Sequence, residues 1–349
     1  MIVDFFKGSL KDFPLLWLTP VLFLSIDCKS DYSQHPKAQE FIKRFAAEHQ
    51  FDPTELSAIL AQAEKKQSIL DAIAKPAEKT LTWAEYQDIF LNDKRINQGV
   101  EFWQENDQTL MEVSQEFGVP KEIIVAIIGV ETYYGRLKGS YRVLDALSTL
   151  GFDYPPREKF FAGELEHFLL LAKEQKQDPV KLLGSYAGAM GYGQFIPSSY
   201  RAYAIDFDGD EIADIWNNPI DALASVANYF NKHGWRPGGE IVTRAHISDD
   251  YDKEILNDKN KPTLTIQELK QKGYIPVTQL GEVNATANAL VYDGKYGKEF
   301  WLGFDNFYVI TRYNRSLLYA MAVYQLSERI KAEYLLHKPE NSNLVKSEF

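Results

Sequence analysis

One glutamate stands where a carboxyl group can act as a general acid. Glu131 follows eight uncharged residues, Ile123 to Val130, so the helix predicted there is apolar on nearly every side and is expected to be internal. A carboxylate in such surroundings loses hydration, which disfavours its charged form and raises its pKa toward the range useful for proton donation. Protonation of a glycosidic oxygen is chemistry of this kind. The alternative is a glutamate that turns into solvent or pairs with Arg136.

A glycine-rich segment over residues 184–200 offers a second set of polar groups. Three glycines between positions 188 and 193 permit close approach to the backbone. Ser185, Tyr192 and Gln194 add hydroxyls, an amide and a ring face, a lining that suits a sugar chain. The glycine spacing does not match a dinucleotide-binding fingerprint, and no strand is predicted before it. A turn that joins packed helices is the alternative interpretation.

An acidic loop resembles a calcium-binding loop. Asp206, Asp208 and Asp210 alternate along the chain, a spacing at which a tight loop directs oxygens at one hard cation, and Ile212 falls where an EF-hand gives a backbone carbonyl. The twelfth position holds Asn217 rather than glutamate. Structural Ca²⁺ is therefore expected, with a plain acidic turn as the alternative.

Composition restricts the classes of protein. The 349 residues include 38 Lys and Arg against 49 Asp and Glu, which gives a net charge of −11. We do not expect binding to nucleic acid, because phosphate neutralisation needs a basic surface. The single cysteine excludes an internal disulfide framework and a thiolate metal cluster. No organic cofactor is expected, since the sequence has no phosphate-binding loop of the Gly-Lys-Ser/Thr type.

The elements that must position these groups are mostly helical. Apolar residues recur at three- and four-residue spacing from Pro36 to about Gly234, and helical periodicity returns over residues 316–332. Asp178-Pro179 and Asn218-Pro219 are typical of helix N-termini. Between the helical regions, a small sheet is predicted from four β-prone pieces: Glu240–His246, Thr263–Ile266, Ala289–Tyr292 and Phe307–Ile310, with a turn at Asp293-Gly294.

The N-terminus predicts export. Residues 13–26 form an apolar run after two lysines, about the length of a signal-peptide core and short for a membrane span. Cys28 follows directly, where a bacterial lipoprotein carries its lipidated cysteine, and residues 29–36 predict a polar tether. Asp27 departs from the small residue that normally precedes such a cysteine. A lipid anchor, a cleaved signal and an uncut anchor are the alternatives.

The chain closely resembles the membrane-bound lytic murein transglycosylase B family in five separated motifs. In order along residues 36–325, they are Gly129-Val-Glu-Thr-Tyr-Tyr-Gly135, Ala146-Leu-Ser-Thr-Leu150, Gly163-Glu-Leu165, the glycine-rich segment and Ser225-Val-Ala-Asn-Tyr-Phe230. The resemblance implies a mainly α (α+β) fold: a lysozyme-like helical core, an accessory α domain and a small antiparallel β domain. The implied ranges are 1–35 for signal or anchor and tether, 36–110 accessory, 111–238 catalytic core, 239–310 β domain, 311–335 return to the core and 336–349 polar tail.

The resemblance also implies roles for single residues. Glu131 would be the sole catalytic acid and base, Ser185 would orient the substrate's acetamido group, and Gln194 would hydrogen-bond the substrate or Glu131. The other implied contacts come from an aromatic wall, a cation and the cleft opposite the glutamate: Tyr229, Arg157, Tyr313, Asn314 and Tyr319, with Tyr86 a weaker candidate. Pro156 and Phe160 depart from the arginine and tyrosine of the family pattern, so contacts to the anionic stem peptide stay open.

What the resemblance implies about function is specific. Glycan strands of peptidoglycan would be cleaved at the β-1,4 bond between N-acetylmuramic acid and N-acetylglucosamine, leaving 1,6-anhydromuramic acid ends. Asp221 would be the last calcium ligand, since the family's acidic ligand lies beyond the loop. A monomeric enzyme in the periplasm, anchored to the outer membrane if Cys28 is lipidated, is expected. A hydrolytic muramidase on the same scaffold and a non-catalytic murein-binding protein are the alternatives.

Overall fold

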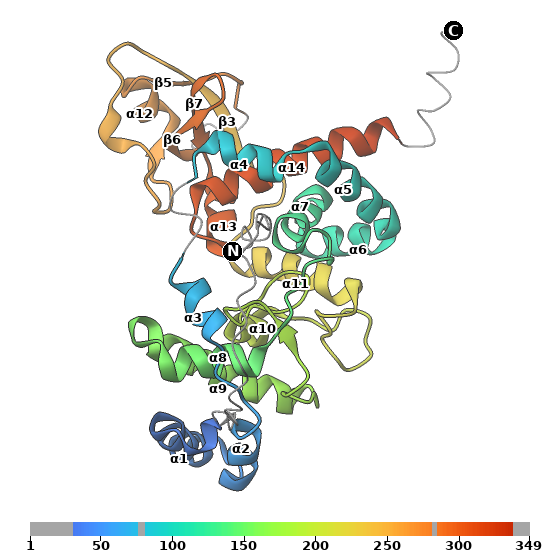
Figure 1. Ribbon diagram of the computed structural model, residues 1–349. Coiled ribbons are helices and arrows are strands. Elements are labelled where there is room, and N and C mark those ends of the chain that lie inside the picture. Colours follow the sequence, from blue (N-terminus) through green and yellow to red (C-terminus); the bar gives the residue numbers. More distant parts are fainter. Residues whose placement is uncertain (1–30, 76–80, 281–284, 338–349) are drawn as a thin grey trace, which may run out of the picture. The chain divides into compact units, whose positions relative to one another are not determined.

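The computed structural model describes residues 31–75, 81–280 and 285–337 as a mainly helical chain with a small five-stranded antiparallel sheet and a two-stranded one, which confirms the predicted fold class (Figure 1). The predicted signal region, Cys28 and most of the polar tail lie outside these residues. Within them, no helix is both long and apolar enough to cross a membrane.

The chain packs into two compact units, each described separately. Of the described residues, the first contains 31–75 and 139–189, and the second contains 81–138, 190–280 and 285–337. These bounds follow packing rather than motifs, so the predicted accessory region and catalytic core are each shared between the units. The domain boundaries drawn from the sequence stay a prediction.

The first unit is built from two groups of helices. Its helices are α1 (Pro36–His49), α2 (Pro53–Leu60), α3 (Gln67–Ile73), α8 (Val143–Asp153) and α9 (Glu158–Glu174), with the short 3-10 helix η3 (Pro155–Arg157) between the last two. α8 packs along α9, and α1 packs on α2. The segments before α8 and after α9 pair as a two-stranded antiparallel sheet of β1 (Tyr141–Arg142) and β2 (Leu183–Gly184). Asp178 caps only a turn through the Val180 amide, so the helix predicted at Asp178-Pro179 is wrong.

The end of the predicted tether is part of this unit. Residues Tyr32–Gln34 form a 3-10 helix, η1, rather than an extended polar segment. Tyr32 is 2% exposed, and its hydroxyl donates to Asp153 Oδ2 over 2.6 Å. A buried tyrosine with a satisfied hydroxyl fixes this stretch of chain against α8. Residues 32–34 therefore belong to the folded first unit, ahead of the predicted boundary at residue 36.

Helix α7 is the centre of the second unit. The helices here are α4 (Trp83–Phe90), α5 (Asp93–Glu105), α6 (Asp107–Phe117), α7 (Lys121–Thr132), α10 (Pro197–Tyr203), α11 (Pro219–Lys232), α13 (Asp305–Tyr313) and α14 (Leu317–Leu336). Every residue from Ile123 to Thr132 is buried, because α5, α6, α11 and α14 all pack against α7. This confirms the predicted internal helix. Asn218 and Pro219 begin α11 as the sequence predicts.

The small sheet belongs to the same unit. Its antiparallel strands are β3 (Val242–Ile247), β4 (Leu264–Thr265), β5 (Tyr274–Pro276), β6 (Thr286–Gly294) and β7 (Gly297–Gly303), in the order β4-β6-β7-β3-β5. Helix α12 (Ile266–Gln271) packs against β4, β5 and β6. Leu269 and Tyr274 are fully buried in the core that the sheet covers.

Two predictions about the sheet are wrong. Phe307–Ile310 is helical, within α13, because a short apolar run also places its first and last residues on one face of a helix. Asp293 and Gly294 do not form the turn of the β6–β7 hairpin, because both are still paired in the strand: Asp293 with Lys298 and Gly294 with Gly297. The turn is therefore at residues 295–296, two positions later than predicted. Gly297 follows it with a φ of +123°, a conformation that would strain a residue with a side chain.

Candidate active site

The carboxyl group of Glu131 is buried at the C-terminal end of α7. Glu131 is 8% exposed and is the next-to-last residue of the helix. The hydroxyl of Tyr319 donates to Glu131 Oε1 over 2.7 Å. The alternative of a side chain extended into solvent is therefore excluded. A carboxyl group held in one orientation inside apolar surroundings can donate and recover a proton at a fixed point.

Tyr319 reaches Glu131 from the first turn of α14. Ser316 caps that helix by accepting a hydrogen bond from the Tyr319 amide, which fixes the turn. Tyr319 is 1% exposed, and burial, together with the charge of Glu131, raises the pKa of its hydroxyl well above the ordinary value. The phenol therefore stays protonated and acts as a donor to Glu131.

A second tyrosine, Tyr313, ends α13 close to the same charge. Burial raises the pKa of Tyr313 well above its ordinary value, and Glu131 contributes through its charge. The Tyr313 hydroxyl donates to the carbonyl of Gly193 over 2.6 Å. The ring of Tyr229 lies 4.7 Å away in an edge-to-face contact, and its hydroxyl donates to the Arg312 carbonyl. The structure thus brings Tyr319 and Tyr313 close to the Glu131 carboxyl, with Tyr229 packed against Tyr313.

The end of α7 is joined to the glycine-rich segment by Thr132. Its hydroxyl lies 2.8 Å from the Tyr192 carbonyl and also accepts from the Gly135 amide. A Cβ on Gly135 would stand 2.0 Å from the Tyr192 ring, so only glycine permits this approach. Sequence reasoning missed Thr132, since nothing in helical periodicity distinguishes a buried threonine that bonds a distant carbonyl.

Within the glycine-rich segment, Gln194 holds the backbone rather than Glu131. Its φ is 51°, and its amide nitrogen donates to the carbonyls of Gly191 (3.0 Å) and Lys138 (3.2 Å). Residues 190 and 195 pair as an isolated bridge across the turn. The amide oxygen of Gln194 has no protein donor among the described residues. That acceptor is the part of Gln194 able to receive a hydrogen bond from a ligand.

Tyr192 carries a cation on its ring. Lys138 Nζ lies 4.5 Å from the ring centroid and also donates to the Trp216 carbonyl. Burial lowers the pKa of Lys138. Neither the lysine nor its partner carbonyl carries a sequence signal, which is why Lys138 was not among the predicted residues.

Ser185 and Arg157 belong to the first unit. The Ser185 hydroxyl accepts the amides of Ala187 (3.3 Å) and Ala189 (3.1 Å), and its proton has no acceptor in the described part of the chain. Arg157 is exposed, with its guanidinium 4.2 Å from the ring of Phe160. Their roles toward a substrate stay predictions.

Two further candidates have structural contacts. Asn314 follows α13, and its side-chain oxygen accepts the Ser316 amide over 3.0 Å, which leads the chain into α14. Tyr86 is 2% exposed in α4, and its ring packs 4.7 Å from that of Phe90. Asn314 stands three residues from the start of α14 and so sets the entry to the helix that carries Tyr319.

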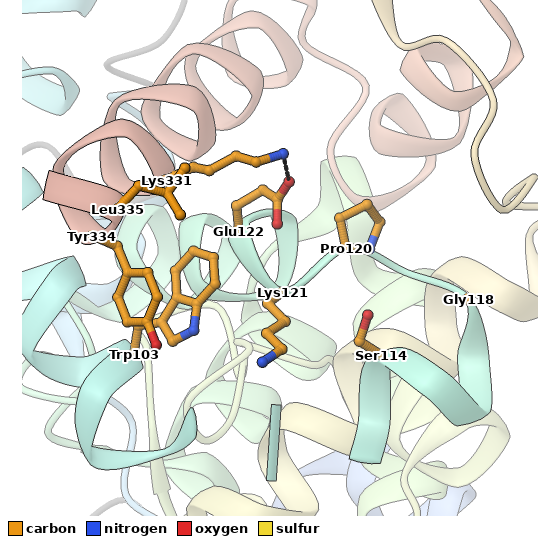
Figure 2. A pocket seen from close by; sticks show the side chains of 9 residues that line it. All are labelled: Trp103, Ser114, Gly118, Pro120, Lys121, Glu122, Lys331, Tyr334 and Leu335. Atoms are coloured by element: carbon orange, nitrogen blue, oxygen red, sulfur yellow. Dashed lines mark hydrogen bonds and ion pairs between the residues drawn. The ribbon is translucent and has the colours of Figure 1, made fainter. Parts of the chain in front are cut away.

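A hollow of about 440 Å³ lies at the other end of α7 (Figure 2). Its wall includes Glu122, whose carboxylate pairs with Lys331 Nζ over 2.7 Å, and Trp103, whose ring stacks on Tyr334. Glu131 stands nine positions after Glu122, which is about 13 Å along a helix. The hollow is therefore separate from the Glu131 group.

The predicted calcium ligands converge in the second unit. Carboxylate oxygens of Asp206, Asp208, Asp210 and Asp221 all lie within 4.8 Å of one another. Asp221 is fully buried, and its pKa is raised by desolvation and by the charges of Asp208 and Asp206. Four acidic groups this close repel one another, and a hard cation with oxygen ligands would relieve the repulsion. The Ile212 carbonyl accepts the Asp214 amide over 2.9 Å.

The chain matches known proteins over most of its length. A family model for the transglycosylase SLT domain covers residues 33–328. Membrane-bound lytic murein transglycosylase B from Escherichia coli (strain K12) is 42% identical over 309 residues, which are 86% of this chain and 84% of that protein.

Solved structures agree with this match. Soluble lytic transglycosylase SltB1 from Pseudomonas aeruginosa superposes with a TM-score of 0.82 at 50% identity, over 85% of this chain and 99% of that chain. Escherichia coli lytic transglycosylase Slt35 in complex with calcium superposes with a TM-score of 0.80 at 42% identity, over 87% of this chain and 96% of that chain. SltB3 from Pseudomonas aeruginosa, in complex with NAG-NAM-pentapeptide, superposes with a TM-score of 0.78 at 29% identity, over 86% of this chain and 80% of that chain.

Proposed function

Because this chain belongs to the transglycosylase SLT-domain family and is a peptidoglycan lytic transglycosylase, we propose that Glu131 is its single catalytic acid and base. The observation that carries the proposal is the burial of Glu131 with its carboxyl held by Tyr319. The bond broken is the β-1,4 link between N-acetylmuramic acid and N-acetylglucosamine.

The reaction needs one carboxyl group that acts twice. Glu131 gives its proton to the leaving glycosidic oxygen while the substrate's own acetamido group covers the cationic carbon, a recognised alternative to a second carboxylate. The Glu131 carboxylate then takes the proton of the C6 hydroxyl, whose oxygen attacks the same sugar carbon. The product is a 1,6-anhydromuramic acid end, water is not consumed, and Glu131 regains its proton.

The surrounding residues support this cycle in different ways. Tyr319 stabilises the carboxylate between the two proton transfers, because a hydrogen bond to a charged group is stronger than one to a neutral group. Tyr313 and Tyr229 pack edge to face against each other. Tyr192 and Gln194 belong to the adjoining glycine-rich segment. Ser185, Arg157 and Asn314 are proposed as substrate contacts by the family pattern.

We propose calcium as a structural ion bound by Asp206, Asp208, Asp210 and Asp221, with the Ile212 carbonyl as a further ligand. The convergence of four carboxylates supports it, as does the relative solved with calcium. The ion would hold residues 206–221 together through charge neutralisation and takes no part in proton transfer.

We propose further that the enzyme acts as a monomer on glycan strands in the periplasm, with Cys28 as a lipid attachment point to the outer membrane. The support is the apolar run before Cys28 and the membrane-bound relative. Mass spectrometry of the N-terminal peptide from purified protein tests the attachment. A Cys28 that carries no lipid, in a chain not cleaved before it, would refute the proposal.

Product analysis tests the catalytic proposal. Purified murein is digested with wild type, Glu131→Gln and the control Glu122→Gln, which changes a glutamate at the other end of the same helix. We expect muropeptides lighter by one water from wild type and the control, and none from Glu131→Gln. Reducing ends would show a hydrolytic muramidase instead, and undiminished release by Glu131→Gln would remove the role given to Glu131.

A further inference from the structure

Arg95 on α5 extends to the end of α7 that carries Glu131. Its Nη1 donates to the carbonyl of Gly129, in the last turn of that helix. Its guanidinium also lies 4.5 Å from the ring centroid of Tyr133 and 5.1 Å from that of Phe90. One planar cation therefore contacts the helix on one side of Glu131 and the turn on the other side.

The turn after Glu131 has a strained backbone. Tyr133 and Tyr134 have φ angles of 53° and 60°, a left-handed conformation that costs free energy for residues with a Cβ. Such a pair persists only where the surroundings fix it. Arg95 fixes both residues: its side chain stacks on Tyr133, and its backbone carbonyl accepts the Tyr134 hydroxyl over 2.8 Å.

The charge of Arg95 has no acidic partner. In the described part of the chain, no ion pair joins a carboxylate to its guanidinium, and Nε lacks a hydrogen-bond partner. Desolvation by burial lowers the pKa of Arg95. A cation kept in such surroundings without a counter-ion is costly for stability. Its one strong contact is instead with the negative end of the α7 dipole, where the carboxylate of Glu131 must also be accommodated.

We propose that Arg95 is a positioning residue of the reaction. It holds the last turn of α7 and the left-handed turn that follows, so the carboxyl group of Glu131 stays at one place while the proton leaves and returns. It also offsets the negative helix end beside that carboxylate. Arg95 does not contact the substrate in this role. The inference rests on the catalytic role proposed for Glu131.

A second arginine provides a matched control. Arg329 on α14 donates Nη1 to the Leu91 carbonyl over 2.9 Å, at the end of α4. This is the same contact between a guanidinium and a helix C-terminus, in the same unit, but the helix it serves carries only Tyr86, the weaker cleft candidate, and no residue proposed to transfer a proton. A purely structural role for Arg95 would make the two arginines equivalent.

The test uses the full chain with Arg95→Lys, Arg95→Met and Arg329→Met. Kinetics are measured on a soluble, purified tetrasaccharide of alternating N-acetylglucosamine and N-acetylmuramic acid, and melting temperatures are measured beside them. We expect Arg95→Met to lower kcat roughly ten- to hundredfold, the scale of a misplaced catalytic group, with KM within about twofold. Arg95→Lys keeps the charge but loses the planar fork, so it should restore part of kcat. Arg329→Met should keep wild-type kcat.

Several results would overturn the positioning role. They are wild-type kcat in Arg95→Lys and Arg95→Met, a loss carried entirely by KM, or an equal fall of kcat in Arg329→Met at a matched melting temperature. Should Arg95→Met not fold, Arg95→Lys decides alone: a lowered kcat at unchanged KM supports the role, and an unchanged kcat refutes it. Wild-type turnover by Glu131→Gln would instead refute the proposed function itself.

Discussion

The hydroxyl of Tyr319 and the carboxyl of Glu131 are joined by a hydrogen bond of 2.7 Å between residues 188 positions apart. Both side chains are buried, and each comes from the end of a long helix, α7 for the acid and α14 for the donor. The site therefore depends on how these two helices pack as much as on the residues themselves.

Removing that donor should slow the reaction without unfolding the protein. In Tyr319→Phe the ring still fills its place, but the carboxylate loses a hydrogen bond worth about 1.5 kcal/mol, or about tenfold in rate. We expect kcat to fall about tenfold. The control is Tyr292→Phe, which removes a buried hydroxyl bonded to the Leu317 carbonyl. Equal rates for Tyr319→Phe and wild type would show that this hydrogen bond plays no part in turnover.

Calcium should raise the melting temperature. An ion that binds only the folded chain adds about 2.7 kcal/mol at a concentration a hundred times its Kd. We expect a rise of several degrees in wild type, measured by circular dichroism after chelation and readdition. Asp221→Asn should abolish the rise, while Glu211→Gln, which changes an exposed acid in the same loop, should keep it. A wild type indifferent to calcium would contradict the proposed site.

Two glycines should respond to alanine in opposite directions. Gly191 has a φ of +68°, and a Cβ there would meet the Ile215 carbonyl oxygen at 2.4 Å. Gly191→Ala should therefore lower the free energy of unfolding by more than about 1 kcal/mol. Gly163 lies inside α9 with nothing within 4 Å of an added Cβ, so Gly163→Ala should raise stability by about 1 kcal/mol. Denaturant midpoints would test both, and a tolerated Gly191→Ala would show that the glycine-rich segment can relax.

The carboxylate of Asp153 should make the first unit less stable in acid. Desolvation acts to raise its pKa, but hydrogen bonds from Lys65 and Tyr32 outweigh this and hold the pKa below its ordinary value. A depressed folded pKa contributes stability above the unfolded value, about 3.9, and the contribution is lost as pH falls through the folded pKa. Asp153→Asn should therefore cost about 2 kcal/mol at pH 7 and much less near pH 3.

Urea unfolding at both pH values, followed by circular dichroism, measures this difference. Tryptophan fluorescence is unsuitable, because the tryptophans at described positions all lie in the second unit. Asp88→Asn is the control, since its pair with Lys295 is exposed and should contribute little at any pH. A cost for Asp153→Asn that does not change with pH would contradict the assignment.

Much of the molecule follows from local sequence patterns. The eight apolar residues before Glu131 require burial on every side of a helix, and α7 has it. Asn218-Pro219 begins a helix because the cap and the fixed proline φ are local properties. The alternating carboxylates of 206–210 likewise fold back on one another through a tight loop, as their spacing predicts.

Other features were decided only by tertiary packing. Phe307–Ile310 fits a strand or a helix in sequence, and it became helical as part of α13, which packs against α14. The sequence pointed to Glu131 through its apolar helix and to Tyr319 through the family resemblance, but not to the bond between them. The sequence predicted no role for Arg95, Thr132 or Lys138, because each acts through a backbone carbonyl distant in the chain, and any sequence supplies such carbonyls. Local composition determined which side chains this protein carries, whereas long-range packing determined which atoms meet.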